Sequence, residues 1–220
     1  MLPDLNRRRR IFLLSPANLS GIRAGYLLGE NARSDLAFRL RHGGLPLGEL
    51  FSFVSGLYFR GKLAYALAFA APPSEVRGAF VITASLGLLV PETIVTLDLL
   101  QQMAGNSIDA DDHRYRAPLD RDCQRLAERI GQASDVVLLG SIATQKYVVP
   151  LLQVFQERLL FPAEFVGRGD MSRGGLMLRS VASGQELEYM PVINAPRHGT
   201  KPPKLLPIPK ALGLRKDAIR

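Results

Sequence analysis

The sequence predicts an α/β protein with a mostly parallel, Rossmann-like sheet of about four strands, helices on both faces and a C-terminal antiparallel hairpin. Two observations support this fold class. Short apolar runs without polar alternation, which are typical of strands buried on both faces of a parallel sheet, recur along the chain. Longer stretches with helical spacing of apolar residues separate these runs, so successive strands can point in the same direction.

Each predicted strand ends at turn or breaker residues. The first contains the run IFLLS and is stopped by Pro16, and the other three are followed within two residues by serine or glycine. The strands are expected at residues 10–15, 78–84, 135–139 and 159–165.

Helices are predicted where apolar residues repeat at helical spacing between a polar cap and a glycine or proline. They are expected at residues 34–41, 55–71, 96–103, 120–130 and 146–155. The fourth is the clearest, because Cys123, Leu126 and Ile130 share one face. After a glycine-rich stretch, residues 176–181 and 186–190 are predicted to form the C-terminal hairpin.

Charge divides the chain into a nearly neutral body and two basic ends. The 220 residues carry a formal net charge of +8, and residues 197–220 contain seven Lys/Arg against one Asp. We therefore predict a basic N-terminal arm at 1–9, a single α/β domain at 10–195 and a proline-rich basic tail at 196–220. The ends could contact nucleic acid, or they could act only as solubilising segments.

Composition excludes several classes of protein. One cysteine excludes an internal disulfide framework, and three histidines without ligand-like spacing predict no metal site. No apolar run approaches the roughly eighteen residues of a membrane span, and the apolar run after the first arginines is too short for a signal peptide. We therefore expect a cytoplasmic protein that does not contact a membrane. The sequence identifies no cofactor and leaves a homo-oligomer open.

Small and hydroxyl residues follow the predicted strands, at the edge where open α/β sheets bind ligands. Ser15 and Asn18 follow the first strand, Ser85 follows the second and Ser141 follows the third. These side chains are candidate ligand-binding residues, because they leave room for a ligand and offer it hydrogen bonds. Ser141 could equally be only a cap for the next helix.

The stretch GRGDMSRGG at residues 167–175 is a candidate anion site. Flexible backbone at Gly167 and Gly169 could turn N–H groups inward, and Arg168 and Arg173 could add forked hydrogen bonds to a phosphate. The glycine spacing matches neither the dinucleotide fingerprint nor the phosphate loop. An exposed turn, in which the glycines only permit positive φ, is the alternative.

Two carboxylates are candidate catalytic residues. Glu92 lies just after an apolar stretch that follows the second strand, and Asp170 lies within the glycine-rich stretch. A group of Tyr58, Arg60 and Lys62 near a helix start could stack on a base and hold a phosphate. The same three side chains could instead only pack against the domain and extend to solvent.

Several segments resemble a group of small prokaryotic α/β domains, namely IFLLSPA, SGLYFRGKLAYALAFA, VITASLGLLVPETI, VVLLGSIATQKYVVPLL and GRGDMSRGG. The stretch ASLGLLVPE is also similar to a motif in the accessory domain of archaeosine synthase and related tRNA-guanine transglycosylase proteins, which handle 7-deazaguanine bases in nucleic acid. The resemblance implies the same fold and a cleft lined by Arg60, Ser85, Glu92 and the 167–175 stretch. Pro91 replaces an arginine of that motif.

These features predict a protein that binds a nucleotide, a nucleobase or a nucleic-acid end, with a phosphorylated small molecule or nucleic acid as its partner. Base modification or N-glycosidic chemistry is the reaction class expected if it is an enzyme, because a carboxylate can stabilise a cationic sugar or activate water. The alternative is a non-catalytic interaction module with basic docking tails. Glu92 and Asp170 in one pocket beside Arg168 would favour the enzyme, and their separation would favour the module.

Overall fold

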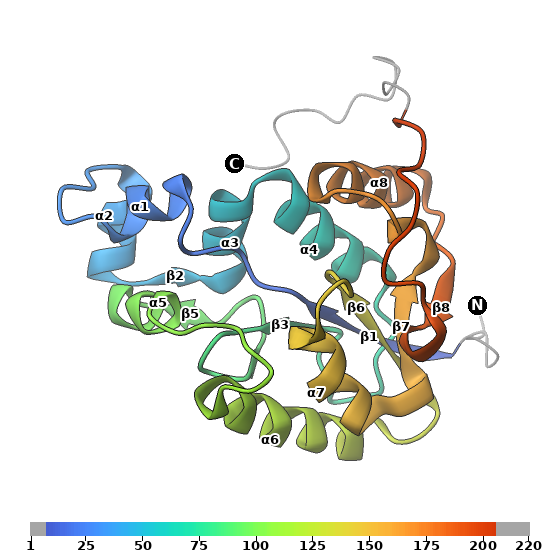
Figure 1. Ribbon diagram of the computed structural model, residues 1–220. Helices are drawn as coiled ribbons and strands as arrows, with labels where there is room; N and C mark the ends of the chain where they lie inside the picture. The colour runs from blue at the N-terminus through green and yellow to red at the C-terminus, as the bar shows by residue number, and fades with distance from the viewer. Residues whose placement is uncertain (1–7, 206–220) are drawn as a thin grey trace.

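The computed structural model describes residues 8–205, so residues 1–7 of the predicted N-terminal arm and residues 206–220 of the predicted tail lie outside the described residues. It shows an α/β fold, as the sequence predicts, with one six-stranded sheet in the order β4-β3-β1-β6-β7-β8 (Figure 1). A second sheet of two short strands, β2 and β5, lies apart from it. One hydrophobic cluster, extending in sequence from Ile11 to Val192, forms the core.

Four parallel strands form the centre of the main sheet, and all four were predicted. They are β3 (Ala79–Ile82), β1 (Arg9–Leu14), β6 (Ser134–Leu139) and β7 (Leu159–Pro162). Every residue of β6 is buried, as expected of an apolar strand covered on both faces. The edges are antiparallel: β4 (Leu88–Leu89) pairs with β3, and β8 (Tyr189–Pro191) pairs with β7.

Helices cover both faces of this sheet (Figure 1). On one face lie α3 (Leu47–Ser55), α4 (Leu57–Phe69) and α8 (Asp170–Ser183), and on the other lie α6 (His113–Ile130) and α7 (Gln145–Phe155). Helix α6 is one turn or more longer than the sequence indicates, because Asp112 caps it by accepting a hydrogen bond from Arg114 N at 2.9 Å.

A smaller group of elements lies beyond the carboxyl ends of the parallel strands, at the left of Figure 1. It comprises α1 (Ile22–Leu28), α2 (Asp35–His42), β2 (Leu45–Pro46), β5 (Ile94–Val95) and α5 (Leu97–Ala104). Helices α2 and α5 were both predicted, α2 with Ser34 as its cap. Ser34 and Thr96 accept hydrogen bonds from Ala37 N and Leu99 N. Helix α1 and strands β2 and β5 were not predicted.

The largest difference from prediction is in the C-terminal third. Residues 170–183 form helix α8, so the first arm of the predicted hairpin, 176–181, is helical, and strand β8 pairs with β7 instead. Buried positions in α8 include Arg173, Met177 and Ser180, which follow helical spacing. Gly174 faces helix α4, and that contact overrides its low helix propensity.

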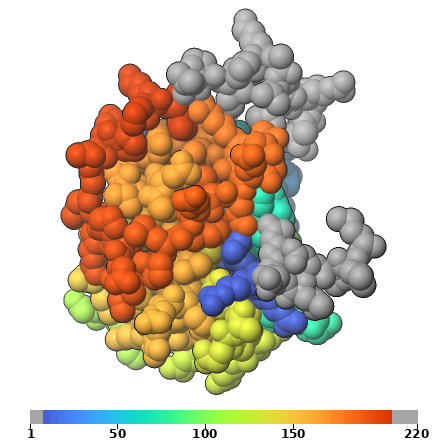
Figure 2. All heavy atoms as spheres, turned by 90° about the vertical axis from the view of Figure 1, so that its right-hand side faces the viewer, coloured from blue at the N-terminus to red at the C-terminus, as the bar shows by residue number. Residues whose placement is uncertain are grey.

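The first residues of the predicted tail pack against the domain. An added Cβ on Gly167 would lie 2.2 Å from Thr200 O, and Pro203 O accepts a hydrogen bond from Arg168 Nη1. Leu205 packs against the core cluster. Figure 2 shows this segment, in red, lying over the orange atoms of the β7–α8 region. Residues 196–205 are therefore part of the folded surface.

Candidate functional site

A cavity of about 530 Å³ lies at the carboxyl edge of the main sheet. Residues 15–20 after β1, Ala84 after β3 and Ser141 after β6 line it. Strand β3 lies on one side of β1 and β6, which comes later in the chain, lies on the other side. The strand order therefore reverses at β1, next to the cavity. Open α/β sheets bind ligands at such a reversal, in the crevice between connections that leave in opposite directions.

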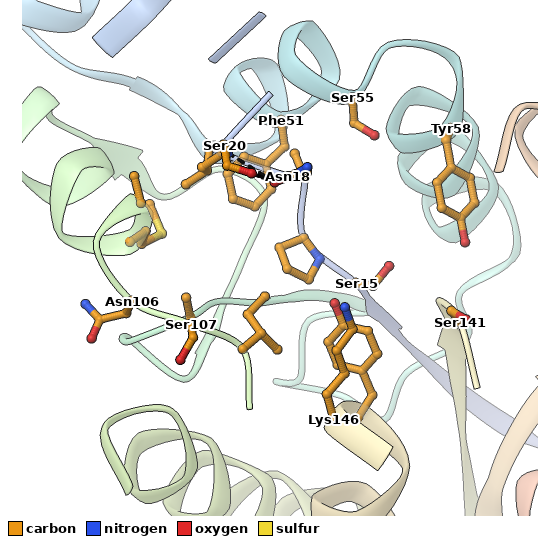
Figure 3. Close-up of a pocket in the computed structure, with 18 of the residues that line it drawn as sticks. Ser15, Asn18, Ser20, Phe51, Ser55, Tyr58, Asn106, Ser107, Ser141 and Lys146 are labelled. Atoms are coloured by element: carbon orange, nitrogen blue, oxygen red, sulfur yellow. Dashed lines mark hydrogen bonds between the residues drawn. The ribbon is translucent and has the colours of Figure 1, made fainter. Parts of the chain in front are cut away.

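Helices supply the other walls of the cavity (Figure 3). Phe51 and Ser55 come from α3, and the end of α5 with the loop after it contributes Met103, Asn106, Ser107 and Ile108. The start of α7 contributes Lys146 and Tyr147, and α8 contributes Asp170. Of the residues that line the cavity, Lys146 and Asp170 carry charge, and the others offer hydroxyls, amides and apolar surface.

Ser15 separates the cavity from a fully buried lysine. Lys62, on α4, is 0% exposed and donates hydrogen bonds to Ser15 Oγ at 2.9 Å and to Ser15 O. Its ammonium lies 4.4 Å from the Tyr58 ring centroid. Burial lowers the pKa of Lys62 to about 7; the charge of Asp170 acts in the opposite direction and that of Arg173 in the same direction. Much of Lys62 is therefore neutral at physiological pH.

Tyr58 also presents a polar atom at this end of the cavity. Its side chain is 6% exposed, and its buried hydroxyl makes no hydrogen bond of normal geometry within residues 8–205. Figure 3 shows the hydroxyl directed toward the end of the cavity where Ser15 and Ser141 lie. Burial raises the pKa of Tyr58 to about 12, while nearby Arg173 lowers it. The phenol stays protonated and can donate a hydrogen bond to a ligand.

Two local features fix the Ser15 side of the cavity. Asn18 Oδ1 accepts hydrogen bonds from Ser20 N at 3.0 Å and Ser20 Oγ at 2.7 Å, which orders the loop after β1 (Figure 3). Gly140, on the neighbouring strand end, leaves room for Ser15: an added Cβ would lie 2.9 Å from Ser15 Cβ and 3.2 Å from Oγ. The position of the Ser15 hydroxyl thus depends on glycine at 140.

The structure brings four of the predicted site residues together. Ser15, Asn18, Ser141 and Asp170 all line the cavity. The first three are there because parallel strands end at one edge of the sheet, which is the reasoning that predicted them. Ser141 is not the cap of α7, whose N-cap residue is Thr144, and its Oγ accepts a 3.3 Å hydrogen bond from Ala143 N.

Glu92, Arg60 and Ser85 lie outside this cavity. Antiparallel β4 returns the chain toward the start of β3, so Glu92 lines a separate cavity of about 170 Å³ beside Gly78. Arg60 is exposed on α4, and Ser85 Oγ is buried in the β3–β4 turn, where it makes no hydrogen bond with any of residues 8–205. Glu92 and Asp170 thus lie in different cavities, and this separation is the arrangement that was expected to favour an interaction module over an enzyme.

The glycine-rich stretch does not form the predicted anion loop. Gly167, Arg168, Gly169 and Arg173 are absent from the lining of the main cavity. Gly167 has φ +72° and accommodates the backbone at 200, and Arg168 donates from Nε to Glu164 O at 2.9 Å. Arg173 donates from Nε and Nη2 to Phe165 O at 3.2 and 3.0 Å. Both arginines hold backbone carbonyls of this protein.

The role of Arg173 leads to a stability prediction. Its side chain is largely buried and lies over the Phe165 ring, with 5.4 Å between guanidinium carbon and centroid. Arg173→Ala should therefore lower the free energy of unfolding by about 2 kcal/mol, because Phe165 O would lose a charged donor. Denaturant unfolding of the variant measures this, with the less buried Arg168→Ala as control. An equal effect of the two substitutions would contradict the assignment.

Lys146 and Tyr147 are site residues that the sequence did not identify, and Lys62 was considered only with Tyr58 and Arg60, as a group that could hold a phosphate or simply pack against the domain. Lys62 had a visible signal: it lies on the same helical stripe as Tyr58, Tyr65 and Phe69, all of which are buried. A lysine on the apolar stripe of a helix indicates a buried amine with a specific partner. For Lys146 and Tyr147, at the start of α7, no signal distinguished a cavity wall from a solvated first turn.

Comparisons with protein-family models, with curated proteins and with solved structures gave no match. The resemblance to archaeosine synthase accessory domains therefore stays a prediction. Within residues 8–205, no group of three or more His, Cys, Asp and Glu is arranged to hold a metal ion. In the same part of the chain, no helix is long and apolar enough to cross a bilayer.

Proposed function

We propose that the protein binds a small phosphorylated molecule of the nucleotide class in the cavity at the carboxyl edge of its sheet. The observation that supports this most directly is the position of a polar cavity at the reversal of strand order. Its volume of about 530 Å³ lies in the range of small-molecule sites.

The residues that line the cavity suit the phosphate, the sugar and the base of a nucleotide. Lys146 is the second residue of α7, and Thr144 makes no side-chain hydrogen bond to the first turn, so an anion there meets a cation and backbone N–H groups. Asn106 and Ser107, on the opposite wall, offer hydrogen bonds to sugar hydroxyls. Phe51 and Tyr147 offer flat apolar surface to a base.

N-glycosidic chemistry has weaker support than binding. Asp170 lines the cavity with a side chain that is 67% exposed, and Glu92 lies in a different cavity. A reaction that needs two carboxylates flanking one bond therefore lacks its second group. If base modification occurs here, Asp170 is the carboxylate for it. The interaction-module alternative predicts instead that the cavity binds no small ligand.

Calorimetric titration with a nucleoside monophosphate and its matched nucleoside tests the proposal. Wild type should bind the nucleotide at least about tenfold more tightly, since a charge-assisted hydrogen bond contributes on the order of 1.5–3 kcal/mol. Lys146→Met should remove most of that difference and leave nucleoside binding unchanged. Lys201→Met, which removes an exposed lysine outside the cavity, is the matched control.

Three outcomes would contradict this function. Equal binding of nucleotide and nucleoside would show that no phosphate is recognised. Nucleotide binding that survives Lys146→Met but falls with Lys201→Met would place the anion outside the cavity. Binding of an oligonucleotide with no binding of the mononucleotide would assign the protein to nucleic acid instead.

A further inference from the structure

Ligand binding alone does not require a buried lysine behind Ser15. Lys62 places an amine in an apolar interior, where a charged group is costly unless it is paired. In the described part of the chain its contacts are the two oxygens of Ser15 and the rings of Tyr58 and Phe59, at 4.4 and 5.0 Å, rather than a carboxylate. A side chain that only donated hydrogen bonds to the end of β1 would not need to be an amine, whose charged form is costly to bury.

Ser15 and Lys62 have the positions of a nucleophile and its general base relative to the cavity. Ser15 lines the cavity, and Lys62 lies behind it without reaching the cavity. A base must be within hydrogen-bond reach of the proton that it takes, and the 2.9 Å separation of Nζ and Oγ meets this condition. Protonated Nζ can only donate to Ser15 Oγ, whereas the neutral amine has a lone pair that can accept the hydroxyl proton. Tyr58, whose hydroxyl makes no hydrogen bond of normal geometry within residues 8–205, lines the same end of the cavity.

We propose that Ser15 Oγ is a nucleophile toward small activated esters and that Lys62 Nζ is the base that accepts its proton. This inference goes beyond binding and does not require the ligand to be a nucleotide. Tyr58 would donate a hydrogen bond to the oxyanion that forms on the carbonyl oxygen, a role in which preorganised donors contribute strongly. Serine with a lysine base is a known variant of the serine–histidine arrangement.

The reaction balances with water as the co-reactant. Ser15 Oγ bonds to the carbonyl carbon of the ester while its proton moves to neutral Lys62 Nζ. The bond between that carbon and the alcohol oxygen then breaks, and the leaving alcohol takes the proton from Lys62. Water next attacks the acyl-serine, Lys62 accepts its proton, and the proton returns to Ser15 Oγ as the acid leaves. The net change is ester plus water to carboxylic acid plus alcohol.

Protonation of Lys62 should control the rate. The charged and titratable groups near it are Tyr58 on its own helix and Asp170 and Arg173 on α8. Because burial lowers the pKa of Lys62 to about 7, the fraction of neutral amine increases as the pH rises through that value. The reactivity of Ser15 should increase over the same interval and then level off.

Covalent labelling with a small alkyl fluorophosphonate tests the pair, with p-nitrophenyl acetate hydrolysis as a second readout. Intact mass should show one adduct with loss of fluoride, and peptide mapping should place it on Ser15. Ser15→Ala should abolish the adduct, and Lys62→Met should slow its formation by at least about a hundredfold. Ser183→Ala, which removes an exposed serine at the end of α8, should label as wild type.

The pH dependence of the labelling rate and one further variant, Ser15→Cys, provide two additional tests. Labelling of wild type should increase between pH 6 and pH 8, whereas Lys62→Met should show no such increase. Should either substitution unfold the protein by circular dichroism, the thiol of Ser15→Cys replaces them: it should be alkylated by iodoacetamide, while buried Cys123 is not.

Absence of an adduct on Ser15 together with no ester hydrolysis would overturn the proposal, as would an unreactive thiol in Ser15→Cys. Labelling that Lys62→Met leaves unchanged would remove Lys62 from the assignment. None of these results depends on nucleotide affinity, so loss of the binding function and loss of this reactivity are separately observable.

Discussion

Gly61→Ala should lower the free energy of unfolding by about 3 kcal/mol, because helices α4 and α8 cross there with their backbones in contact. An added Cβ on Gly61 would lie 2.7 Å from Gly174 O and 2.9 Å from Gly174 Cα. Gly174→Ala should have a similar effect, since its Cβ would lie 2.7 Å from Leu57 O. Backbone atoms cannot move aside as a flexible side chain does, so the helices would have to separate.

Gly175→Ala is the matched control on the same helix. Its Cβ would lie 3.5 Å from Leu205 Cδ1, which is ordinary van der Waals contact. Since alanine is favoured over glycine inside a helix by about 1 kcal/mol, this variant should be as stable as wild type or slightly more stable. Denaturant unfolding of the three variants measures the difference. Equal stabilities of Gly61→Ala and Gly175→Ala would show that the crossing tolerates a methyl group.

The glycine-rich stretch shows why one part of the fold was not predicted. Gly174 and Gly175 interrupt the apolar pattern, and glycine is a poor helix former, so local signals indicate a loop. The reason for glycine at 174 lies on α4, more than a hundred residues earlier in the chain. By contrast, β1 and β6 were predicted because continuous apolar sequence is a local property of buried strands.

The candidate site likewise contains some residues that could be predicted from local sequence and others that could not. Ser15 and Ser141 were predicted because each follows a strand of the parallel sheet, and the sheet alone brings them together. Glu92 was misplaced because a two-residue antiparallel strand, β4, turns the chain back toward the start of β3. The role of Lys62 was underestimated because its partner, Ser15, lies just after strand β1, 47 residues earlier in the chain. Contacts between distant segments decide these positions.

Lys62→Met should remove a pH dependence of stability that wild type shows between pH 7 and pH 8.5. Burial lowers the pKa of Lys62 to about 7 in the folded protein, from the ordinary value of 10.5 expected when unfolded. Between these values the unfolded chain binds a proton that the folded protein does not bind. Wild-type stability should therefore increase with pH, by on the order of 1 kcal/mol per pH unit, and should level off below about 7.

Comparison of the two proteins isolates the contribution of this one group. Cys123 and the buried tyrosines, whose pKa values are raised by burial, lower stability at higher pH but are present in both proteins. Loss of the hydrogen bonds to Ser15 changes stability by an amount that does not vary with pH over this interval. Urea unfolding at several pH values should give a difference, wild type minus Lys62→Met, that increases from pH 7 to pH 8.5. A difference that stays constant over that interval would mean that Lys62 keeps an ordinary pKa and its proton, and it would then be unable to act as a base for Ser15 near neutral pH.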